Sequence, residues 1–128
     1  MTILRTDRLT LHPSGPTHAA ALAAFLQAND AHLAPWSPVP PLGFATEAFQ
    51  ATRMAAEAAD REAGRSWRWL LYRDADLIGW VHVSTIVRGV WHCANLGYAA
   101  GAEVQGQGLM REGVEAVVAH AFSDLGLH

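Results

Sequence analysis

Apolar residues recur with two different periods along the first third of the chain. Leu9 and Leu11 alternate with polar neighbours, which is the period of a strand with one buried face. Over residues 17–33 the apolar positions follow helical spacing, which predicts an amphipathic helix. The side chains of Ser14 and Thr17 are candidates to cap this helix. A short strand and then a helix are therefore predicted to open the fold.

A proline-rich segment at residues 34–41 interrupts the helical pattern. Proline lacks a backbone N–H and biases the residue before it towards extended backbone, so a helix cannot continue here. Thr46 then stands where its hydroxyl can cap a second helix, predicted over about residues 47–63. Gly64 follows at the position that tolerates left-handed backbone and ends this helix.

The middle of the chain is rich in aromatic and β-branched residues. Strands are predicted over residues 67–73, 77–87 and 90–100, joined by short turns. Strands in that sequence with turns of that length are typical of an antiparallel meander. Gly97 and Gly101 near the end of the last strand favour a bulge or a close backbone approach.

A glycine-rich turn at residues 105–110 leads from the last strand into a helix that ends at Gly126. The first turn of a helix offers unpaired N–H groups and a partial positive charge, and glycines let an anion approach the backbone. A Walker loop requires a lysine, and the chain has none. A dinucleotide fingerprint requires glycine or alanine where Arg111 stands, within a parallel sheet. The pyrophosphate of coenzyme A remains as the candidate ligand.

Composition narrows the class of protein. The chain has 128 residues, 51% hydrophobic and 16% charged, which predicts one folded domain over residues 1–128. One cysteine excludes a disulfide framework, and the histidines show no metal-ligand spacing, so no metal is expected. All nine basic residues are scattered arginines and the net charge is −3, which argues against nucleic acid as a partner. No apolar run reaches the ~18–20 residues of a membrane helix, so a cytoplasmic chain with no membrane partner is expected.

Five segments in order along the chain resemble the GNAT acyltransferase superfamily, and in particular its RimJ/RimL branch. They are Thr6–Leu9, Leu33–Pro38, Leu77–Gly79, Ile86–Gly89 with Leu96–Tyr98, and Gln105–Met110. The superfamily signature is Gln/Arg-x-x-Gly-x-Gly/Ala at the start of a helix, and Gln105, Gly108 and Met110 occupy its three defined positions. Met110 departs from the third.

The resemblance implies an α/β (α+β) fold with a mostly antiparallel sheet flanked by helices. It also implies transfer of an acetyl group from acetyl-CoA to an amine, most simply the α-amino group of a (ribosomal) protein N-terminus, although relatives also acetylate small amines. The pantetheine arm would pair with Tyr98, Ala99 and Ala100, and the pyrophosphate would lie on Gln105, Gly106, Gln107, Gly108, Leu109 and Met110.

Two further residues are candidates for a role in transfer. His92 is a candidate general base because imidazole titrates near neutral pH, although an ordinary strand histidine is the alternative. Trp36 in the proline-rich segment is a candidate wall of the acceptor pocket, with a hydrophobic plug as the alternative. Glu112 could contact the amine, but a carboxylate is favoured at a helix N-terminus in any case.

Members of this family continue beyond the position of residue 128 with further strands and a helix. We therefore expect a domain that is incomplete at its C-terminus, with the general acid outside this sequence. An exposed edge strand would favour homo-oligomers or self-association. A non-catalytic coenzyme A-binding remnant, or a half-domain that needs a partner segment, is the alternative function.

Overall fold

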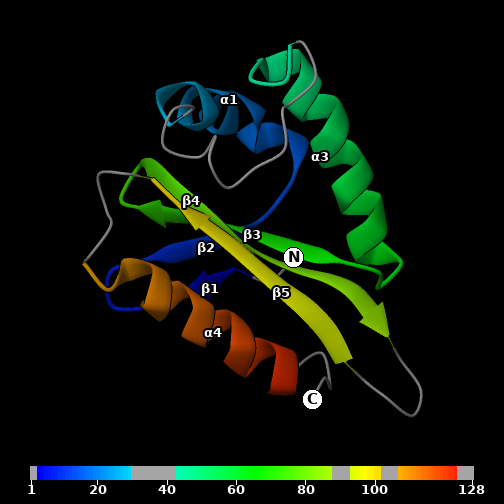
Figure 1. Cartoon of the computed structure of the whole chain (residues 1–128), viewed down its shortest axis with the longest axis vertical. Helices are drawn as coiled ribbons and strands as arrows, with labels where there is room; N and C mark the ends of the chain where they lie inside the picture. The colour runs from blue at the N-terminus through cyan, green and yellow to red at the C-terminus, as the bar shows by residue number, and fades with distance from the viewer. Residues whose placement is uncertain (1–2, 30–42, 88–92, 102–106, 124–128) are drawn as a thin grey trace.

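An antiparallel sheet organises the chain (Figure 1). The computed structural model describes residues 3–29, 43–87, 93–101 and 107–123. Within these residues the sheet has five strands in the order β1-β2-β3-β4-β5, each antiparallel to its neighbours. They are β1 (Leu4–Arg5), β2 (Thr10–Pro13), β3 (Trp67–Arg73), β4 (Asp76–Val87) and β5 (Cys93–Ala100). The predicted meander is confirmed.

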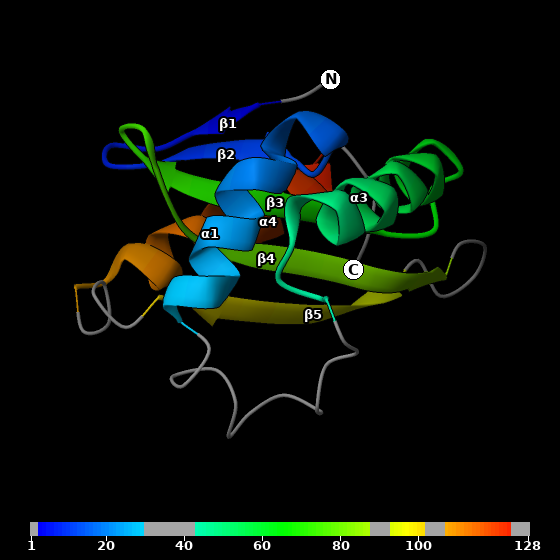
Figure 2. The same cartoon turned by 90° about the horizontal axis from the view of Figure 1, so that it is seen from above.

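Helices cover both faces of this sheet, as Figure 2 shows from above. They are the 3-10 helix η1 (Pro16–His18), α1 (Ala19–Ala28), α3 (Glu47–Glu62) and α4 (Leu109–Ser123). α1 and α3 pack on one face, and α4 packs on the other. The sheet is thus the middle of three layers, as the resemblance implied.

Side chains of β3 alternate between the two faces of the sheet and contribute to the core on each face. Trp69 and Leu71 are fully buried on the α4 face with Leu11, Val81 and Val117. Their neighbours along the strand belong to the opposite face, where the buried residues are Leu22, Phe25, Leu26, Met54 and Leu70. A strand buried on both sides reads as a continuous apolar run, which is why residues 67–73 carried so clear a signal.

Local signals located α3 well. The Thr46 hydroxyl accepts a hydrogen bond from the Phe49 N–H, so Thr46 is the N-cap that the sequence predicted. Gly64 follows the end of this helix with a φ of +74°, the left-handed conformation expected there.

The expected cap of the first helix is wrong. η1 begins after Gly15 and α1 begins after His18, and neither of these residues makes a side-chain cap. The Ser14 hydroxyl instead donates to Glu57 Oε1 on α3 over 2.9 Å. Its partner lies 43 positions away in the sequence, beyond any local capping pattern.

Glu57 also anchors α3 to the sheet through a shielded ion pair. The Arg68 Nη2 atom of β3 donates to Glu57 Oε1 over 2.6 Å, and the two side chains are 2% and 15% exposed. Shielding from water strengthens such a pair and makes the loss of one partner costly. Arg68 therefore keeps a fixed positive charge on the α1/α3 face of the sheet.

Candidate active site

The turn that begins α4 has the geometry of an anion site. Gly108 adopts a φ of +74°, a conformation that residues with a side chain rarely adopt, and its carbonyl accepts a hydrogen bond from the Glu112 N–H over 3.1 Å. The first N–H groups of the helix have no acceptor within it. Leu109 is buried beneath the sheet and Met110 packs against the same core, so the helix start is firmly seated.

An arginine from the other end of the chain holds this turn in place. Arg8 Nη1 donates to the Gln107 carbonyl over 2.9 Å, and Arg8 Nε donates to Glu112 Oε1 over 2.8 Å. Glu112 Oε2 also accepts the Arg8 N–H over 3.0 Å and the Thr6 hydroxyl. The segment between β1 and β2 therefore grips both the last residues of the turn and the first turn of α4.

The grip of Arg8 fixes the direction of a peptide plane. The Gln107 carbonyl points to the guanidinium, and in a trans peptide the following N–H points the opposite way. The N–H of Gly108 is therefore turned away from Arg8. A second guanidinium, that of Arg73, donates to the Gln107 Oε1 atom over 3.1 Å and fixes the side chain as well.

We predict that this anchor is sensitive to acid. Hydrogen bonds from Thr6 and Arg8 hold the pKa of Glu112 below its ordinary value. A carboxyl with a lowered folded pKa contributes stability above its unfolded pKa, and this contribution is lost as pH falls through the folded pKa. Glu112→Gln should therefore lower the melting temperature at pH 7, and the gap to wild type should close below about pH 4. Thermal melts across this pH range measure the gap.

The exposed Arg111–Glu115 pair on the same helix provides the control. These side chains are 85% and 66% exposed, and exposed pairs contribute little. Glu115→Gln should melt close to wild type at both ends of the range. A Glu112→Gln variant that also melted like wild type at pH 7 would contradict an anchoring role.

The edge of β5 beside the turn presents a second surface with backbone groups that face outward. The Gly101 N–H donates to the Ile78 carbonyl over 2.8 Å, which makes this a hydrogen-bonded pair between the two strands. Because such pairs alternate along an antiparallel ladder, the backbone of Ala99 also faces β4, whereas Tyr98 and Ala100 turn their N–H and C=O groups outward. In the described part of the chain β5 has no neighbour on that side.

The two surfaces lie at the same end of the sheet. The C-terminal end of β5 and the N-terminal end of α4 are close together in Figure 1. Of the three strand residues in the sequence interpretation, Tyr98 and Ala100 have backbone groups available to an added chain, and those of Ala99 are used by β4. A bulge or a close approach was expected at Gly97 and Gly101. Pairing is regular at Gly97 and shifts instead between Ser84 and Val87, whereas Gly101 is closely approached, since a Cβ atom built there would lie 3.1 Å from Phe25 Cε2.

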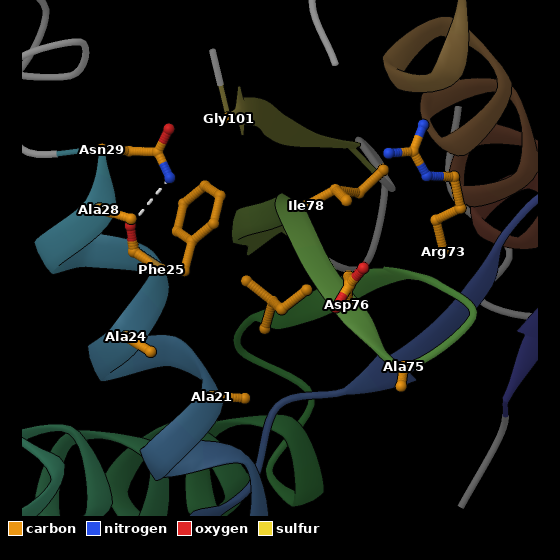
Figure 3. A pocket seen from close by; sticks show the side chains of 11 residues that line it. Ala21, Ala24, Phe25, Ala28, Asn29, Arg73, Ala75, Asp76, Ile78 and Gly101 are labelled. Carbon is orange, nitrogen blue, oxygen red and sulfur yellow. Dashed lines mark hydrogen bonds between the residues drawn. The ribbon is translucent and has the colours of Figure 1, made fainter. Parts of the chain in front are cut away.

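A hollow of about 390 Å³ adjoins this end of β5 on the α1 face (Figure 3). Small residues of α1 form one wall, and Gly101 and Ile78 form another. The Asn29 amide near its mouth donates to the Phe25 carbonyl over 2.9 Å. In Figure 3 the Arg73 side chain extends towards α4, in keeping with its bond to the turn.

Several sequence predictions cannot be placed. Trp36, His92, Gln105 and Gly106 lie outside the described residues and stay predictions. Of the predicted pyrophosphate ligands, the structure places Gln107, Gly108, Leu109 and Met110 together at the start of α4.

Sequence reasoning assigned no role to Thr6 and Arg8, although both belong to a segment that carried the family resemblance. Glu112 was considered as a contact for the amine, and the structure shows its carboxylate occupied by these two residues. Among the described residues no group of three or more His, Cys, Asp and Glu side chains could hold a metal ion.

Residues 8–128 match the family described as acetyltransferase (GNAT) domain. The chain belongs to the GNAT family. It is 30% identical over 117 residues to the [ribosomal protein uS5]-alanine N-acetyltransferase of Escherichia coli (strain K12). This alignment covers 90% of the chain and 60% of that relative, so the chain spans less than two thirds of the curated enzyme.

Solved structures share the GNAT fold of the chain. The ribosomal-protein-S5-alanine acetyltransferase of Vibrio fischeri superposes with a TM-score of 0.94 at 24% identity, covering 100% of this chain and 71% of that one. RimJ of Mycobacterium smegmatis, solved in complex with CoA-disulfide, gives a TM-score of 0.88 at 21% identity, with coverage of 99% and 63%. In the described parts of this GNAT chain, no helix is both long enough and apolar enough to cross a membrane.

Proposed function

We propose that this GNAT chain takes part in the transfer of an acetyl group from acetyl-CoA to the α-amino group of a protein N-terminus, with a ribosomal protein as the substrate class. The observation that carries the proposal is the turn at Gly108, whose peptide plane is set by Arg8 beside the open edge of β5. The names of the relatives at 30% identity support the acceptor class. An enzyme with that acceptor would work in the cytoplasm.

The described residues fit the coenzyme in two respects. Gly108 has no side chain and a left-handed backbone, so the approach of a phosphate to its N–H is not blocked by a Cβ atom. Tyr98 and Ala100 point amide groups outward at the spacing of a strand, which suits an arm that itself contains amides. When bound, acetyl-CoA supplies an activated acyl group.

The residues of the chain would bind and orient that group. The N–H groups of Gln105, Gly106, Gln107, Gly108, Leu109 and Met110 would hold the pyrophosphate at the positive end of α4. An outward N–H of β5 would donate to the thioester carbonyl and favour the developing negative charge. We keep Trp36 as a wall of the acceptor pocket, and His92, which lies outside the described residues, stays a sequence prediction for the base, as an alternative to His82 of β4.

The test is release of free thiol from acetyl-CoA in the presence of defined peptides. A peptide that begins with alanine and carries the N-terminal sequence of uS5 should promote release, since its amine can be acylated. The same peptide with a blocked N-terminus should not, and a peptide whose only amine is a lysine side chain should be a poor acceptor. Calorimetric binding of acetyl-CoA without thiol release would contradict transfer by this chain.

A further inference from the structure

The α1/α3 face of the sheet carries a histidine opposite a glycine of β5. His82 of β4 pairs with Gly97 of β5, and side chains opposite each other in an antiparallel pair share a face. Trp80, two positions before His82, packs with the α1 core, so His82 projects from this same face. A Cβ atom built on Gly97 would meet nothing within 4 Å among the described residues, which leaves room on β5 next to the imidazole.

This room adjoins the proposed path of the coenzyme. Neighbouring strands lie ~4.8 Å apart, so the His82 ring stands within one strand width of the outward-facing edge. The edge groups of Tyr98 and Ala100 lie between Gly97 and the turn at Gly108. An arm that starts at the turn and runs back along β5 brings its thioester towards Gly97.

The surroundings of His82 favour the neutral form of its imidazole. Burial and then the positive charge of Arg68, its partner on β3, hold the pKa of His82 below its ordinary value. From α3, Glu57 acts in the opposite direction and Arg53 in the same direction as Arg68. Arg68 is fixed by its ion pair with Glu57, so its charge stays beside the imidazole over the range in which acyl transfer is measured.

We propose that His82 is the proton acceptor for the amine in acetyl transfer, an assignment that rests on the proposed function. The lone pair of the neutral amine forms a C–N bond with the thioester carbonyl carbon while the C–S bond breaks. The imidazole nitrogen takes the surplus proton of the amine, and the electron pair of the broken bond leaves on sulfur. The imidazolium returns its proton to water, and the thiolate takes one from water.

The other described histidines lie away from the edge of β5 and pack against aromatic side chains. His12 of β2 and His18 of η1 pack against Tyr72 of β3, away from the β5 edge, and His18 Nδ1 lies 2.8 Å from the Tyr72 hydroxyl. His120 belongs to α4 and is buried against Trp67 and Trp69 of β3. Among the described histidines, His82 is the one on a strand next to the edge of β5.

The experiment compares His82→Gln with a matched control, His12→Gln. The control also replaces a strand histidine with a lowered pKa, but on β2, three strands from β5. His82→Gln should lower kcat by about a hundredfold to ten-thousandfold while the KM for acetyl-CoA stays within twofold. In wild type kcat/KM for the peptide should fall as pH drops through the lowered pKa of His82, and this acid limb should vanish in the variant. Calorimetric binding of acetyl-CoA verifies that each variant is folded.

Each result decides between distinct claims. A His82→Gln variant with wild-type kcat and an unchanged acid limb would overturn the role of His82 and leave the proposed function standing. Wild-type protein that binds acetyl-CoA but transfers nothing to any amine would overturn the proposed function, and this assignment with it. Should His82→Gln fail to fold, NMR titration of the imidazole in wild type takes its place. Addition of coenzyme A and acceptor peptide should shift the His82 ring signals, and signals that do not move on peptide binding would overturn the assignment.

Discussion

A Gly108→Glu variant is expected to lose acetyl-CoA binding at concentrations that saturate the wild-type chain. The left-handed φ of +74° is strained for any residue with a side chain, and a Cβ atom here would lie 3.5 Å from Arg8 Nη2. The new carboxylate would repel the phosphates and compete with the Gln107 carbonyl for Arg8. We expect Kd to rise at least about a hundredfold, which is about 2.7 kcal/mol. Isothermal titration calorimetry measures the change.

Gly64→Glu separates the loss of the site from the strain of the backbone. Gly64, at the far end of α3, has the same φ of +74°, and an added Cβ there would meet no atom within 4 Å in the part of the chain that the structure describes. This variant should share the strain of the first and bind acetyl-CoA as wild type does. If both variants lost binding to the same degree, general destabilisation would explain the result, and if Gly108→Glu bound normally, the pyrophosphate would not lie on this turn.

The second large effect is expected at Gly79 of β4, which lies opposite Ala100 of β5. A Cβ atom there would collide with the Ala99 carbonyl oxygen and lie 3.1 Å from the Ala100 Cα atom. It would also lie 3.2 Å from the Met110 Cε atom. Backbone atoms cannot move aside as a side chain can, so Gly79→Ala must push β5 away from β4 or lose pairing. We expect destabilisation of about 3 kcal/mol, at the upper end for an overpacked site.

Denaturant unfolding measures this loss, and Gly97→Ala on the facing strand is its control. An added Cβ at Gly97 meets no described residue within 4 Å, and alanine costs less conformational entropy than glycine in a strand. Gly97→Ala should therefore unfold at the wild-type denaturant concentration or slightly above it. Equal stability of Gly79→Ala and wild type would show that the two strands separate more easily than their contacts indicate.

Elements with local signals were predictable from the sequence. The helix from Thr46 to Gly64 has a capping hydroxyl at one end and a left-handed glycine at the other, and both act within a few residues. The two-residue strand β1 is too short to show a period, so it could not be predicted from the hydrophobic pattern. The role of Ser14 was also out of reach, because Glu57 comes beside it only when α3 packs on the sheet.

In the candidate site, too, features formed by one stretch of chain were predictable, and features formed by distant segments were not. Glycines in series after a strand point to an anion turn because a single stretch of chain makes the whole feature. The grip of Arg8 on Gln107 and the place of His82 beside Gly97 depend on strand order and register. Register also decides that the backbone N–H and C=O groups of Tyr98 and Ala100, and not those of Ala99, face outward. This alternation depends on the position in the ladder and not on the type of residue, so the sequence does not reveal it.

The hydrogen bond between Thr6 and Glu112 affects the order of folding during synthesis, because it joins residues that are 106 positions apart. Contacts between distant positions repay their loop-closure entropy only when the segments between them are already in place. During synthesis from the N-terminus, Thr6 and Arg8 therefore cannot hold the turn before α4 through Glu112 until residue 112 has left the ribosome. A nascent chain can therefore form most of its sheet well before Thr6 and Arg8 hold the turn that begins α4.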